Sequence, residues 1–102
     1  MTRILFERTG GFMGRKVSLE LDLDELPAPQ AGTLKRLLDE TGFSTLEAAY
    51  PAPSSARDVF TYQITVETES GRHTVQATDL SMPNALRPLV GELSRLAQTR
   101  RS

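Results

Sequence analysis

The side chains in this chain that could support acid–base or nucleophilic chemistry are few and far apart. There is one histidine, His73, and there is no cysteine. A serine nucleophile would need His73 together with Ser54, Ser55 or Ser81 and a carboxylate, and no nucleophile elbow or comparable positioning motif is present. A single histidine also cannot build a histidine-rich metal site. We therefore expect His73 to be a surface or rim residue beside a turn.

The carboxylates give no stronger candidate for a site. Asp22, Asp24 and Glu25 stand close together, but the D-x-[DN]-x-[DN]-G loop and distal Glu of a calcium site are absent. Asp39 and Glu40 are expected on the surface of a helix. A glycosidase-like pair of carboxylates stays open on sequence alone, although no feature selects one. The sequence thus favours a binding or inhibitory protein over an enzyme.

The most unusual segment is ERTGGFMGRK, residues 7–16, in which three glycines within five positions surround Phe12 and Met13. Arg8 and Arg15 flank the glycines. The segment is not a phosphate loop, because a Walker A loop requires G-x-x-x-x-G-K-[ST] and no Gly-Lys pair opens a helix here. We expect a long hairpin loop between two strands.

Two interpretations of this loop remain open. As a plain connector, Gly10 and Gly11 supply positive φ angles, Gly14 closes a bulge, and Phe12 folds back onto the sheet. Alternatively the tip projects from the protein, and Phe12 or Met13 is the anchor in a partner's pocket. Aromatic anchors dominate many interfaces, and the flanking arginines could pair with carboxylates at the rim of that pocket.

The elements that must position this loop follow from hydrophobic periodicity. Residues 2–8 and 15–23 are predicted strands, and the second alternates cleanly between apolar and polar side chains. In the first strand Ile4 and Phe6 are expected to point inward and Leu5 outward. Prolines after the second strand prepare a helix over 31–42, with Gly42 as its C-terminal stop.

The second half of the chain repeats this order. Residues 43–58 are predicted to form a connection with little regular structure, in which we expect Phe43 to pack under the loop. The connection is a secondary candidate for a contact surface. Residues 59–78 are predicted to form a hairpin with a turn at ESGR. A last helix over 81–98 has an apolar stripe, and it either starts late, near Pro88, or is kinked there.

These elements predict an α+β fold with ββαββα order. The economical arrangement is a four-stranded, mainly antiparallel sheet with both helices on its apolar face. The apolar residues suffice to fill the space between the sheet and the helices, which disfavours a small-molecule or enzymatic cavity there. The polar face of the sheet is the surface that a general interaction module would use.

Composition agrees with a single domain over residues 1–102, with a frayed tail at 99–102. The formal net charge of −1 gives no reason to expect nucleic acid or an anionic membrane as a partner. No apolar run approaches the roughly 18 residues of a membrane span, and the N-terminus lacks the apolar core of a signal peptide. We expect a cytoplasmic protein without cofactors or metals, and the same features leave export by an unconventional route open.

The sequence resembles the emfourin family, small bacterial inhibitors of protealysin, a thermolysin-like zinc metallopeptidase. The resemblance starts in RILFERTGGFMGRKVSLELDLDELP and continues through LKRLLDETGF, FTYQITVE, RHTV and MPNALRPLVGEL. The segments E-R-x-G-G-F-x-G and P-x-A-L-R-P-L carry it most specifically. The resemblance implies a non-enzymatic protein whose partner is a thermolysin-like metallopeptidase.

The resemblance places Arg8, Gly10, Gly11, Phe12 and Gly14 in the glycine-rich segment of the family, and Met13 lies between these matched positions. We infer that the partner-binding loop comprises these residues together with Met13 and Arg15, and we expect it to occlude the active-site cleft of the peptidase. A monomer is favoured, and the oligomeric state stays open. The alternative is a non-enzymatic interaction module or subunit with an unrelated partner.

Overall fold

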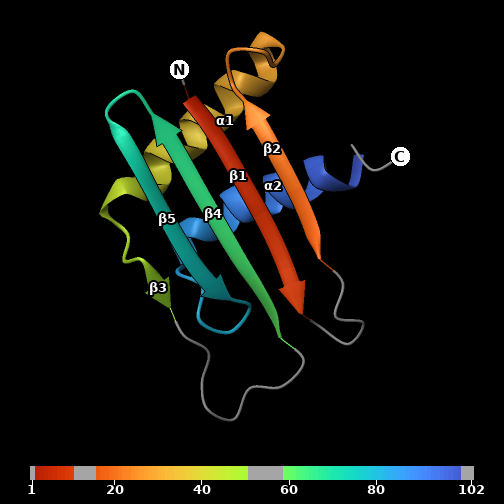
Figure 1. Cartoon of the computed structure of the whole chain (residues 1–102), viewed down its shortest axis with the longest axis vertical. Helices are drawn as coiled ribbons and strands as arrows, with labels where there is room; N and C mark the ends of the chain where they lie inside the picture. Colours follow the sequence, from red (N-terminus) through yellow and green to blue (C-terminus); the bar gives the residue numbers. More distant parts are fainter. Residues whose placement is uncertain (1, 11–15, 51–58, 100–102) are drawn as a thin grey trace.

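In a computed structural model of the chain, residues 2–10, 16–50 and 59–99 are described. The described chain forms five strands and two helices, labelled in Figure 1. The strands are β1 (Thr2–Gly10), β2 (Val17–Asp22), β3 (Ala49–Tyr50), β4 (Phe60–Thr68) and β5 (Gly71–Thr78), and the helices are α1 (Ala28–Thr41) and α2 (Arg87–Thr99).

The strands form one mixed sheet in the order β2-β1-β4-β5-β3. β1 lies between β2 and β4 and is antiparallel to both, and β4 is also antiparallel to β5. The predicted alternation in the first strand is confirmed, because Ile4 and Phe6 are 0% and 1% exposed whereas Leu5 is only partly covered.

The sheet has five strands, so the prediction of four was wrong by one short strand. β3 lies inside the connection that was expected to have little regular structure, and it pairs parallel to β5 through Ala49 with Gln76 and Tyr50 with Ala77. Gln76 also donates its backbone N–H to the carbonyl of Ala48. A strand of two residues is too short to show a hydrophobic period, and only the neighbouring strand specifies it.

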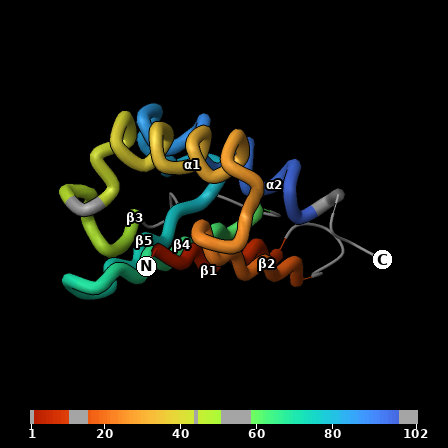
Figure 2. The backbone as a smooth tube through the Cα atoms, turned by 90° about the horizontal axis from the view of Figure 1, so that it is seen from above, coloured from red at the N-terminus to blue at the C-terminus, as the bar shows by residue number. Residues whose placement is uncertain are grey.

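Both helices cover one face of the sheet, as predicted, and the view along the sheet in Figure 2 shows them as a single layer. The core lies between the two layers. It is built from alternating residues of the strands and from the apolar stripes of the helices. Its fully buried large side chains are Ile4, Phe6, Leu21, Leu23, Leu34, Ile64, Val75, Leu86, Leu89 and Leu93.

Helix α1 begins three residues earlier than predicted, at Ala28, because Pro29 fits the first turn of a helix. It ends where predicted, since Gly42 adopts φ +64° and donates its N–H to the carbonyls of Leu38 and Asp39. Near this end the hydroxyl of Thr41 donates to the carbonyl oxygen of Ala85 at 3.0 Å. That bond ties α1 to the segment before α2.

Helix α2 begins late, so the kinked alternative does not apply. A 3₁₀ helix spans Asn84–Leu86, and the α-helix starts at Arg87. Pro88 is therefore the second residue of the helix, where a backbone N–H has no intrahelical partner to lose. This start leaves Leu89 and Leu93 completely buried against the sheet.

Candidate functional site

The predicted partner-binding residues fall on both sides of the limit of the described chain. Arg8 and Gly10 lie in β1. Gly11, Phe12, Met13, Gly14 and Arg15 lie outside the described residues. The structure therefore shows the strand ends between which the glycine-rich segment runs. We call these strand ends, with the residues packed against them, the base of the segment.

The base lies at one end of the sheet, where the ends of several strands lie together (Figure 1). Arg8 pairs with Val17 across β1 and β2, so the two ends of the glycine-rich segment are held side by side. On the other side of β1, Gly10 pairs with Phe60, the first residue of β4. Tyr50, the last residue of β3, is at the same end because it pairs with Ala77.

Gly10 can only be glycine in this backbone conformation. Its φ is +93°, in the region that side chains avoid. A Cβ at this position would also lie 2.7 Å from the carbonyl oxygen of Val59, well inside van der Waals contact. The positive φ expected for Gly10 is thus present, and it is combined with a close backbone approach to the start of β4.

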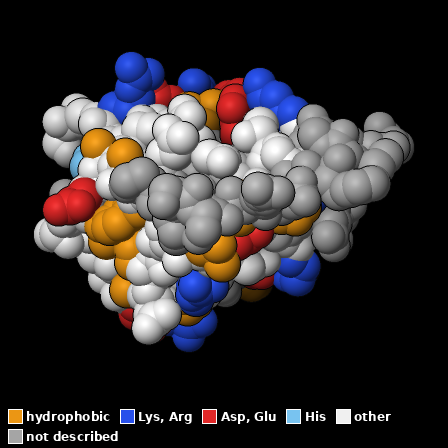
Figure 3. Space-filling view, turned by 90° about the horizontal axis from the view of Figure 1, so that it is seen from below, with side chains coloured by type: hydrophobic (Ala, Val, Ile, Leu, Met, Phe, Trp, Pro, Cys, Tyr) orange, Lys and Arg blue, Asp and Glu red, His pale blue; other side chains and the backbone are white. Residues whose placement is uncertain are grey.

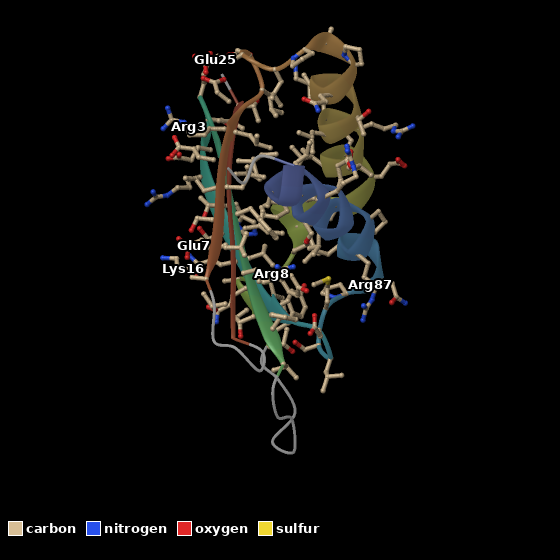
Figure 4. All side chains as sticks on the ribbon, turned by 90° about the vertical axis from the view of Figure 1, so that its right-hand side faces the viewer. Arg3, Glu7, Arg8, Lys16, Glu25 and Arg87 are labelled. Carbon is tan, nitrogen blue, oxygen red and sulfur yellow. The ribbon has the colours of Figure 1, made fainter. Side chains whose placement is uncertain are left out.

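Arg8 points to the helix side of the sheet, as Figure 4 shows. Its guanidinium carbon lies 5.0 Å from the centre of the Phe60 ring, a distance typical of a cation–π contact. Its Nε is buried and has no hydrogen-bond partner. The sequence placed Arg8 at the flank of a loop, whereas the structure seats its side chain beneath the end of the sheet.

Asp79 organises the polar groups next to Arg8. Its carboxylate accepts the backbone N–H of Phe60 at 3.2 Å, and its own N–H donates to the carbonyl of Phe60 at 3.2 Å. The guanidinium of Arg87 donates to the Asp79 carbonyl at 3.3 Å. Burial raises the pKa of Tyr62, and the hydrogen bond to Asp79 and the charge of Asp79 raise it further, while Arg8 opposes the shift. The base therefore holds two arginines beside one carboxylate and one phenol.

The opposite face of the sheet is covered by neither helix and carries exposed ion pairs. Arg3 lies between Glu20 and Glu67, at 3.7 and 3.9 Å, and Glu67 also faces Arg72 at 3.8 Å. Lys16 pairs with Glu7 at 3.6 Å. Figure 4 shows Arg3, Glu7 and Lys16 on this face, on the other side of the sheet from Arg8. Because the charges here are mutually compensated and solvent-exposed, the face offers no strong field to a charged partner.

A groove of about 670 Å³ opens at the other end of the molecule, between α1 and the β4–β5 hairpin. Leu38, Phe43 and Val66 supply apolar lining, and Lys35 and Asp39 are the charged residues that α1 contributes. The groove is open to solvent and is not an enclosed cavity in the core between the layers. The volume lies within the range of small-molecule pockets, but the groove is remote from Arg8 and Gly10.

His73 lines this groove and is held as a rim residue. Its Nε2 lies 3.0 Å from the carbonyl oxygen of Leu46, so Nε2 carries the proton in this bond. The edge of Phe43 packs against its ring at 5.5 Å between centres. Within residues 2–10, 16–50 and 59–99, no group of three or more His, Asp or Glu residues could hold a metal ion. No helix in those ranges is long and apolar enough to cross a membrane.

Comparison with known families agrees with the resemblance in the sequence. The Emfourin family model matches residues 6–94, which include Arg8 and the entire glycine-rich segment. The chain belongs to the emfourin family. Neither curated proteins nor solved structures gave a match. Emfourin membership suggests a metallopeptidase inhibitor with a protease as partner.

The emfourin match covers residues that sequence reasoning did not single out. Phe60 and Tyr62 were predicted only as part of the hairpin over residues 59–78. In the structure the ring of Phe60 lies under the guanidinium of Arg8, and Arg8 acts on the pKa of Tyr62. Asp79 lies between the predicted hairpin and the predicted last helix and was not singled out. Its only signal was its place directly after a predicted strand, where aspartate side chains often bond backbone N–H groups.

Proposed function

We propose that this protein inhibits a protealysin-like or thermolysin-like zinc metallopeptidase by occluding the active-site cleft with the glycine-rich segment of residues 8–15. The observation that carries the proposal is the emfourin match over residues 6–94, because it spans this segment, the part of β1 from Phe6 onward and the whole of β2. Phe12 and Met13 are the proposed anchors. Arg15 and the glycines complete the contact surface.

The geometry of the base supports this role. The segment starts and ends on paired strands, since Arg8 faces Val17 in the register of β1 and β2. β1 is itself held on its other side by β4, and Gly10 ends this strand in a close backbone approach to Val59. A recognition segment with anchored ends loses less conformational entropy on binding than a free peptide does.

The chemistry of the target suits these residues. Catalytic zinc sites keep one coordination position for water or substrate. Thermolysin-like enzymes, to which the family resemblance points, prefer a bulky apolar side chain just after the cleaved bond. Phe12 or Met13 would fill such a pocket, and inhibition would result from steric exclusion of the substrate. The chain contains no cysteine thiolate with which to withdraw the metal.

The alternative is an interaction module with an unrelated partner, which would use the uncovered face of the sheet. The ion pairs on that face are already compensated internally, so the base of the glycine-rich segment is the better-supported contact. A variant of the uncovered face separates the two proposals. Arg72→Ala should leave protease inhibition unchanged if the glycine-rich segment is the contact surface.

The test is a titration of peptide-substrate cleavage by a protealysin-like enzyme with this protein. We expect activity to fall near one-to-one stoichiometry and added zinc to have no effect. The double variant Phe12→Ala/Met13→Ala should weaken inhibition by about tenfold or more. Arg36→Ala is the control, because this side chain is exposed on α1. Full inhibition by the double variant would refute the anchor role.

A further inference from the structure

Leu80 is the one large hydrophobic side chain that is exposed in the described part of the chain, with 60% of its surface accessible. It lies between β5 and the 3₁₀ helix at Asn84–Leu86, in the turn formed by residues 79–81. A single exposed leucine is ordinary on a protein surface. Leu80 differs from an ordinary exposed leucine in two respects: its turn is held by hydrogen bonds, and it lies near the base of the glycine-rich segment.

The turn that carries Leu80 is fixed on both sides of the residue. Before it, Asp79 exchanges two hydrogen bonds with the backbone of Phe60. After it, the hydroxyl of Ser81 donates to the carbonyl of Tyr50, and the N–H of Ser81 donates to the carbonyl of Thr78. The turn is thus tied to β3 and β4, and the side chain of Leu80 is presented to solvent from a preorganised backbone.

Leu80 is at the same end of the molecule as the base of the glycine-rich segment. Phe60 connects the two, because it pairs with Gly10 on one side and bonds to Asp79 on the other. Figure 3 views this end from below and shows hydrophobic side chains on its described surface. A partner that contacts this end of the sheet at Gly10 and Phe60 would therefore also approach Leu80.

We infer that Leu80 is a second apolar contact of the inhibitory surface and rests against an apolar depression beside the cleft of the peptidase. This inference depends on the proposed function. A stable contact between two copies of this chain would require about 1,200 Å² or more of buried surface, which one leucine does not supply. The peptidase, engaged at the same time through the neighbouring segment, is the partner that a single added anchor fits.

The inference is tested with Leu80→Ser and Leu80→Met in the cleavage assay and by surface binding kinetics. We expect Leu80→Ser to weaken inhibition by about fivefold to thirtyfold, mainly through faster dissociation. Leu80→Met, which keeps an apolar side chain of similar volume, should stay within about twofold of the wild type. Both variants should melt at the temperature of the wild type, because the side chain is exposed.

The outcomes separate this inference from the proposed function. If Leu80→Ser inhibits as well as the wild type, the second contact is refuted while the glycine-rich segment can still be the inhibitor. If Leu80→Ser only disrupts self-association, measured by sedimentation, and leaves inhibition unchanged, the leucine serves a contact between copies and the inference is also refuted. If the wild type fails to inhibit at large excess, both proposals fall together.

Discussion

The guanidinium of Arg8 lies over the ring of Phe60, with 5.0 Å between the guanidinium carbon and the ring centre. Arg8 belongs to the strand that leads into the glycine-rich segment, and Phe60 opens the neighbouring strand. Their contact therefore joins the two strands just below the point where the chain leaves the sheet. This contact and three other features of the structure each lead to a measurable prediction.

Replacing Arg8 by Met should raise the pKa of Tyr62 further above its ordinary value. Arg8 opposes the upward shift caused by burial and by Asp79, so removing its charge removes the opposition. The phenolate absorbance of Tyr62 reports this pKa in a Tyr50→Phe background, since the chain has two tyrosines. The variant should also lose about 0.5–2 kcal/mol of stability with the cation–π contact. An unchanged or lowered Tyr62 pKa would contradict the electrostatic effect of Arg8 on the Tyr62 phenol.

Gly10→Ala should destabilise the protein by about 2 kcal/mol or more. The new Cβ would lie 2.7 Å from the Val59 carbonyl oxygen, and the φ of +93° is unfavourable for alanine. Gly32→Ala is the matched control, because Gly32 lies within α1 with no atom within 4 Å of the added Cβ. That control should gain about 0.5–1 kcal/mol. Urea unfolding measures both, and equal midpoints would disprove the close approach at Gly10.

Thr41→Val should cost about 1–2 kcal/mol, because it leaves the Ala85 carbonyl without the hydroxyl donor that now reaches it at 3.0 Å. Thr41 is 6% exposed, so water cannot easily replace the hydroxyl. Thr33→Val serves for comparison. Its hydroxyl bonds Pro29 in an exposed turn of the same helix, and we expect a change within about 0.5 kcal/mol. In thermal unfolding, Thr41→Val should therefore lower the melting temperature more than Thr33→Val does.

Glu92→Gln should lower stability at neutral pH and have little effect in acid. Arg95 donates to both carboxylate oxygens of Glu92, at 2.7 and 2.8 Å, and these bonds hold the pKa of Glu92 below its ordinary value of 4.5. A lowered folded-state pKa gives stability that is present above 4.5 and is lost as the pH falls through the folded-state value.

The control for Glu92 is Glu40→Gln, which removes an exposed pair with Arg36 at 3.8 Å. A pair of that geometry contributes little. Melting curves between neutral and acidic pH should show a pH-dependent difference from the wild type for Glu92→Gln alone. A difference of the same size at both pH values would mean that packing, and not the charge pair, accounts for the loss.

The sequence predicts the four long strands, because each has a hydrophobic period of two over a sufficient length. The same alternation assigns Ile4 and Phe6 to the core, and by parity it assigns Arg8 to that face as well. Its charge nevertheless suggested an exposed flank. The hydrophobic period predicts on which face of the sheet a residue lies. It does not predict the ring of Phe60, on another strand, against which the Arg8 guanidinium packs on that face.

The parts that could not be predicted depend on distant neighbours. β3 is specified by pairing with β5, and Asp79 is positioned by bonds to Phe60. The groove beside His73 is lined by residues of α1 and of the β4–β5 hairpin, which are far apart in the sequence, so no local pattern records it. For the glycine-rich segment, the sequence supplied the residues and the family, and the structure supplied the base that holds its two ends.

The pairing of β1 with β4 has a consequence for biosynthesis. Thr2 of β1 pairs with Thr68 of β4, and among the described strands β2 pairs only with β1. The β1–β2 hairpin alone would be marginal in water, so it must wait for β4 to emerge from the ribosome before it is secured. β4 must therefore be synthesised before the base of the glycine-rich segment is complete, and a nascent chain halted before β4 should lack the base that the proposed inhibition requires.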